Sequence, residues 1–171
     1  MIEYQSIVDS LEFNYLDADR ALDGVEPSHL HVRINPQTLS ISEQVAHIAY
    51  CEALGVFGFL DERSQDEWPV ESRLLQPTFW YPPEMLNSPI HNDLATMELS
   101  AIQSEWQNVH RSVVARLREL EQTVDAPMPK AWAPDKTVGG HLRYLSYHVA
   151  YHVGQIYLMR HLLGETTPEQ T

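Results

Sequence analysis

The chain has 171 residues, of which 43% are hydrophobic and 20% are charged, and this composition is typical of one folded globular domain. Its 24 acidic and 11 basic residues give a formal net charge of −13, which repels phosphate backbones and anionic lipids, so we expect no nucleic-acid partner. No apolar run approaches the roughly 20 residues of a membrane-spanning helix, so we expect no membrane partner either.

Two amphipathic helices are predicted in the first 60 residues. Residues 2–22 carry apolar side chains at steps of three and four, which form one stripe on a helix, and Gly24 and Pro27 end it. A second helix is predicted from Ser40 to about residue 60, because Ser40 and Glu43 have the spacing of a capping box.

A long connection, residues 63–87, follows the second helix. Loops of this length in compact domains are usually functional or disordered. This one contains four aromatic residues, whose surface is costly to leave in water, so we expect an ordered crossover packed on the bundle. They are Trp68, Phe79, Trp80 and Tyr81. A third helix is predicted to open at Ser88, with Pro89 at its first helical position, and to end near residue 120.

The fourth helix is predicted from Thr137 to Gly164, where Gly164 would form a left-handed C-terminal cap. Its apolar positions cover a wide arc, which indicates burial against more than one partner, and a homodimer would supply the extra one. The predicted fold class is therefore all-α: a four-helix bundle with a long crossover between helices two and three. We expect residues 1–164 to form a single domain and residues 165–171 a polar tail.

Histidine spacing indicates a metal site in the bundle core. His148 and His152 are four residues apart, so on a helix they lie about 40° apart in angle and roughly 6 Å along the axis, and can converge on one ion. His47, in the second helix, could add a ligand from a facing helix. From spacing alone, a metal-free bundle with hydrogen-bonded core histidines remains an alternative, and periodicity does not select His47.

A family resemblance supplies the third ligand. The segment TVGGHLRYLSYHVAYHVGQIYLMRHLLG resembles the last helix of the DinB/YfiT-like proteins, whose pattern is His-x-x-x-His-x-Gly-Gln followed by an apolar run and Gly; the matching residues are His148, His152, Gly154 and Gln155. The segment LSISEQVAHIAYCE resembles the second helix of that family, in which a His is the first ligand. That residue is His47, so the resemblance implies a three-histidine site for one divalent metal. Tyr144 departs from the family, because many members carry a further His there.

The resemblance also implies a metal-dependent enzyme of transferase or hydrolase type. The family includes thiol-dependent S-transferases that use low-molecular-weight thiols, related isomerases and proteins described as metal-dependent hydrolases. Three neutral imidazoles leave an ion an open position, where it activates water or a thiol. Zinc or nickel suits this donor set best, with manganese and iron as alternatives.

No general base accompanies the histidine motif. Val149 stands where zinc hydrolases of the His-Glu-x-x-His type carry their Glu, and Glu52 lies about 140° round the helix from His47. This absence favours activation of a substrate thiol by a small margin over hydrolysis. The alternative from another functional class is a non-catalytic helical dimer that binds metal for stability or sensing.

Four further residues are candidates for the pocket. Cys51 lies one turn after His47 and could face the ion, although a core-filling role is the favoured interpretation. Gln155 shares the inward face of the last helix. Trp80 or Tyr81 could cover the mouth of the pocket, and the rival interpretation is that these rings cover the outer surface of the bundle. We expect a cytoplasmic protein, because Cys51 is the single cysteine and the chain opens without a signal peptide.

Overall fold

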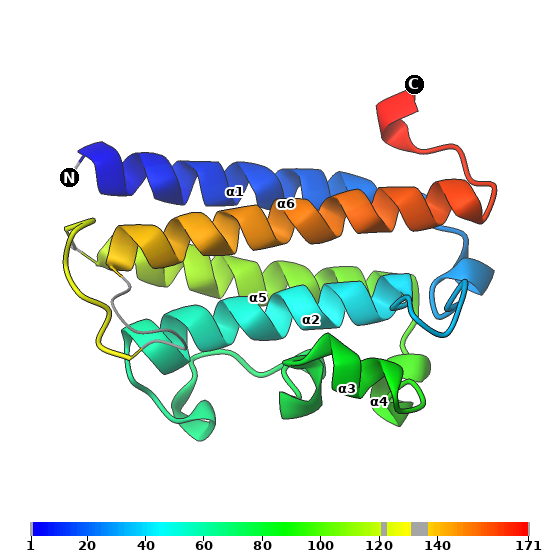
Figure 1. Cartoon of the computed structure of the whole chain (residues 1–171), viewed down its shortest axis with the longest axis horizontal. Coiled ribbons are helices and arrows are strands. Elements are labelled where there is room, and N and C mark those ends of the chain that lie inside the picture. Colours follow the sequence, from blue (N-terminus) through cyan, green and yellow to red (C-terminus); the bar gives the residue numbers. More distant parts are fainter. Residues whose placement is uncertain (1, 121–122, 131–136, 171) are drawn as a thin grey trace.

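The computed structural model describes residues 2–120, 123–130 and 137–170. Four long helical segments lie side by side (Figure 1): α1 (Ile2–Leu22), α2 (Ile41–Ala53) with its continuation η2 (Leu54–Leu60), α5 (Leu99–Glu119) and α6 (Val138–Leu162). Short helical turns follow the first and last of them: η1 (Pro27–His29) after α1 and η5 (Pro168–Gln170) after α6. The described ranges contain no strand, so the predicted all-α bundle is confirmed.

Each long helix packs against two others, α1 against α5 and α6, and α2 against α5 and α6. Helices α1 and α6 run parallel. Their starts meet where Arg143 pairs with Glu3, and their ends meet where Arg160 donates to the Ala21 carbonyl. Helices α2 and α5 also run parallel, with Arg116 bonded to Asp61 at their ends. The crossover returns the chain to the starting end of α2 before α5 begins, so α5 runs in the same direction as α2 (Figure 1).

The predicted helix boundaries hold where they rest on caps. Ser40 accepts from the Glu43 amide while the Glu43 carboxylate accepts from the Ser40 amide, which is the predicted capping box. Gly24 and Gly164 have positive φ angles of 67° and 83°, as left-handed residues after a helix require. The final turns of the second helix differ from an α-helix, because Leu54–Leu60 adopts π-helical geometry.

The predicted start of the third helix is wrong. Helix α5 begins at Leu99 rather than Ser88, and the connection from residue 61 to residue 98 contains η3 (Gln65–Glu67), η4 (Pro77–Phe79), α3 (Pro82–Leu86) and α4 (Asn92–Ala95). The Ser88 carbonyl accepts from Arg33 at 2.9 Å, and Leu94 is fully buried within α4. This tertiary burial outweighs the local Ser-Pro signal. The expectation of an ordered crossover is met by Trp68 and Phe79, which are buried in the core.

The segment after Gly164 returns to the bundle. Arg160 donates to the Glu165 carboxylate at 2.6 Å, and His29 lies 2.7 Å from the same side chain. Thr167 is 1% exposed. None of the described helices is long and apolar enough to cross a membrane.

Candidate metal centre

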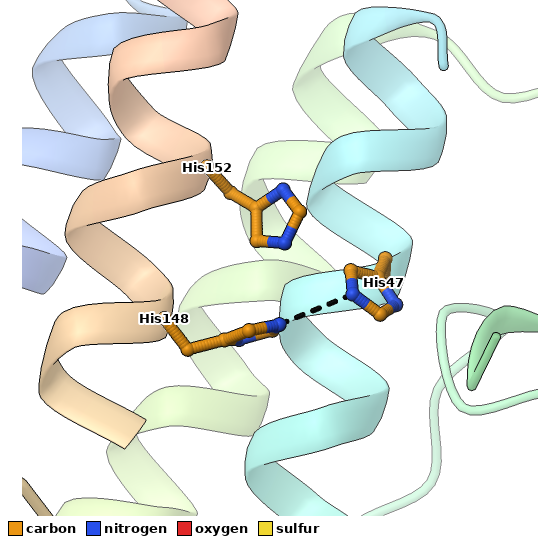
Figure 2. A group of neighbouring side chains, drawn as sticks. All are labelled: His47, His148 and His152. Atoms are coloured by element: carbon orange, nitrogen blue, oxygen red, sulfur yellow. Dashed lines mark hydrogen bonds between the residues drawn. The ribbon is translucent and has the colours of Figure 1, made fainter. Parts of the chain in front are cut away.

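Three histidines from two facing helices meet in the bundle interior. His47 extends from α2, and His148 and His152 extend from α6 toward it (Figure 2). One nitrogen of each ring lies within 4.8 Å of the others, and the Nε2 atoms of His47 and His148 are 3.1 Å apart. All three side chains are buried. The structure thus brings together the residues that spacing and family resemblance select.

Outer hydrogen bonds orient two of the three rings. The Nδ1–H of His47 donates to the Phe79 carbonyl at 2.7 Å, and the Nδ1–H of His152 donates to Gln44 Oε1 at 2.5 Å. With the proton on Nδ1, each ring directs the lone pair of Nε2 toward the cluster. Histidines that bind metal are typically fixed in this way. Nδ1 of His148 is buried and has no hydrogen-bond partner among the described residues.

The environment of the cluster keeps the imidazoles neutral. Burial, together with repulsion from the neighbouring rings, lowers the pKa of His148 to about 2 and that of His152 to about 3. Burial also lowers the pKa of His47, against a smaller opposite effect of the Phe79 carbonyl. Neutral imidazole is the form that binds a metal ion. The donor set therefore fits a divalent cation that prefers nitrogen, with a position left open for a ligand.

Cys51 lies beside the cluster but outside it. Its Sγ is 3.5 Å from Nδ1 of His47, the nitrogen that bonds to Phe79, and 3.9 Å from Nε2. Burial raises the pKa of this thiol, so the sulfur remains protonated at neutral pH. The side chain is 7% exposed. This environment supports a packing role at the edge of the cavity.

A cavity of about 640 Å³ opens beside the three histidines. Cys51, Gln155, Trp80 and Tyr81 all line it. Trp80 packs edge-on against Phe59, with ring centroids 6.3 Å apart, and both crossover rings keep part of their surface exposed. The predicted pocket residues therefore surround one cavity, whose volume suits a small-molecule ligand.

The remaining described histidines have other partners. His110 stacks on Tyr15 with centroids 4.7 Å apart, and His161 lies 2.7 Å from Thr167 Oγ1. His141 does line the cavity, and its Nε2 lies 3.1 Å from the Gly55 carbonyl. Of nine histidines in the chain, three converge on one point.

Glu52 does not line the cavity. It is fully buried on α2, and neither carboxyl oxygen has a hydrogen-bond partner among the described residues. Burial raises the pKa of Glu52 well above its ordinary range, and the nearby Tyr15 hydroxyl offsets this only in part. Because Glu52 is enclosed and does not line the cavity, it is not placed to act as a general base there.

Sequence reasoning did not identify Gln44 or the Phe79 carbonyl as parts of the site. Gln44 precedes His47 by three residues, so a one-turn spacing places both on one helix face, and this signal was present in the sequence. The Phe79 contact joins residues 32 positions apart and depends on the path of the crossover.

The family comparison agrees with this geometry. The model of the DinB superfamily matches residues 10–156, a span that contains His47, His148 and His152. The chain belongs to the DinB superfamily. No curated protein and no solved structure matches it.

Proposed function

We propose that this DinB superfamily chain is a metal-dependent enzyme that holds one divalent cation on His47, His148 and His152. Three neutral imidazoles favour zinc or nickel, with manganese or iron as second choices. The observation that carries the proposal is the meeting of three buried imidazole nitrogens, within 4.8 Å of one another, at the wall of a cavity that could admit a small molecule.

The reaction type proposed is transfer to or from a low-molecular-weight thiol, with hydrolysis second. A divalent cation at this site would supply a Lewis acid that makes a nucleophile of a thiol or of water at neutral pH. Gln44 and the Phe79 carbonyl would hold His152 and His47 in position for it. No Asp or Glu lines the cavity among the described residues, so a mechanism without a separate carboxylate base is favoured.

We further propose a cytoplasmic homodimer. Helices α1 and α6 expose large apolar side chains, and a partner copy would remove such surface from water. These residues are Phe13, Leu16, Tyr147, Tyr151, Leu158 and Leu162. The same exposed surface favours the second candidate function, a dimer that binds metal for stability or sensing without catalysis.

Two measurements separate these candidates. The zinc-loaded and nickel-loaded proteins are assayed with a panel of low-molecular-weight thiols and 1-chloro-2,4-dinitrobenzene, where thioether formation releases chloride. The enzyme proposal expects turnover that disappears in His148→Ala, whose metal content is measured in parallel. Stoichiometric metal with no turnover for any thiol would favour the non-catalytic dimer.

A further inference from the structure

We propose that the cavity accepts an uncharged substrate with an aromatic or apolar body and discriminates against one that carries a remote carboxylate or phosphate. This inference rests on the proposed function, in which the cation holds the donor atom of the substrate. It goes further by specifying the chemistry of the rest of the substrate.

The described residues that line the cavity carry no formal charge. None of its 25 described residues is Asp, Glu, Lys or Arg, although these types make up 20% of the chain. At that frequency about five of the 25 would be charged. Away from the proposed cation, an ionised group of a ligand would therefore enter an environment without a counter-charge, where desolvation disfavours it.

The arginines that neighbour lining residues in the sequence have other partners. Arg33, beside the lining residue Ile34, pairs with the buried Glu43 and donates to the Met85 and Ser88 carbonyls. These bonds would have to break before its guanidinium could reach a ligand, and Glu43 would then be left buried without its counter-charge.

The two arginines of α6 are held by partners outside the cavity. Arg143 binds Glu3 of α1 at 2.6 Å. Arg160 is 1% exposed and binds Glu165 and the Ala21 carbonyl. Neither lines the cavity, and no Lys or Arg is among the described lining residues.

Aromatic and amide groups take the place of charge. Six aromatic rings other than histidine line the cavity, and such rings favour flat apolar ligands. They are Phe59, Trp80, Tyr81, Tyr144, Tyr147 and Tyr151. Gln155 lies against His152 and lines the cavity with its side-chain amide. It is placed to accept from a neutral N–H or O–H of the substrate.

Two matched thiols test this inference on the cobalt-loaded protein. Phenylmethanethiol and 4-(mercaptomethyl)benzoate share a donor atom, and the para carboxylate is too far from the sulfur to reach the same cation. Affinity is read from the absorption band that appears when a thiolate binds Co²⁺. We expect the uncharged thiol to bind at least about tenfold more tightly. Equal affinity, tighter binding of the carboxylate, or binding of neither thiol would overturn the inference.

A charge variant tests the cause. Leu158→Lys places an ammonium group on the cavity lining, whereas Leu16→Lys changes a similarly exposed leucine that lies outside it; the two leucines are 56% and 58% exposed. Both belong to the surface proposed for the dimer, so Leu16→Lys also controls for any loss of association. Lysine and leucine have similar helix propensities, so both variants should fold. We expect the ratio of affinities for the uncharged and the carboxylate thiol to fall below about threefold in Leu158→Lys and to stay at its wild-type value in Leu16→Lys. An unchanged preference in Leu158→Lys would refute the electrostatic explanation.

Metal loading is measured before either thiol is added. Failure to load Co²⁺ would refute the proposed metal centre itself. Stoichiometric loading with the opposite thiol preference would refute only the inference about the substrate.

Discussion

The hydrogen bond from His152 to Gln44 gives a specific prediction about metal affinity. Substitution Gln44→Ala removes the Oε1 atom that accepts from Nδ1–H at 2.5 Å. Alanine is the strongest helix former, so α2 should keep its conformation. Gln44 is 4% exposed and His152 is 6% exposed, so this bond is largely shielded from bulk solvent. The ring then loses the bond that fixes its tautomer and its orientation toward the cluster.

The size of the effect follows from comparable metal sites. Loss of an outer partner typically weakens metal binding by about 10- to 100-fold. This corresponds to about 1.4–2.7 kcal/mol of binding free energy. Gln44→Glu keeps an acceptor at the same position and increases the basicity of the imidazole, so its affinity should equal or exceed that of the wild type.

The assay is competition for zinc between the protein and a chromophoric chelator near neutral pH, with far-UV circular dichroism as the test of folding. Gln37→Ala is the matched control, because Gln37 lines the same cavity. Zinc affinity of Gln44→Ala within about twofold of the wild type would refute the positioning role. An equal loss in Gln44→Glu would refute it as well.

Three further predictions concern stability, assembly and acid. Burial raises the pKa of Glu52 above its ordinary 4.5, so the free energy of unfolding should fall as pH rises above 4.5, by up to about 1.4 kcal/mol per pH unit. In urea unfolding, Glu52→Gln should show a smaller change of this free energy with pH. The pKa of His148 is lowered from 6.5 to about 2, so below pH 6.5 the unfolded chain binds a proton that the folded metal-free protein does not, and the free energy of unfolding should fall. His148→Gln should show a smaller fall in urea unfolding over the same pH range. Light scattering at micromolar concentration should give twice the 19.7 kDa of the chain, and a monomeric mass would contradict the proposed dimer.

The bundle was predictable because its signals are local. The capping box at Ser40 and the left-handed residue at Gly164 each depend on a few neighbouring residues. The false start at Ser88 has the opposite cause, since Arg33 binds its carbonyl from 55 positions away. Local propensity cannot represent such a contact.

The candidate site shows the same division. The spacing of His148 and His152 is a property of one helix, whereas the selection of His47 needed the family resemblance. The Phe79 carbonyl that orients His47 and the uncharged lining of the cavity both arise from segments distant in sequence. The sequence therefore predicted the histidine cluster better than the features that determine what enters beside it.

Metal content of purified protein tests the central claim most directly. Elemental analysis after zinc loading and removal of excess ion should give one equivalent in the wild type and in the control His161→Ala, which alters the same helix outside the cluster. His148→Ala and His152→Ala should remain helical and lose stoichiometric metal, since an open two-ligand site binds an ion weakly. Full occupancy in either of these variants, or a metal-free wild type after loading, would contradict the three-histidine centre.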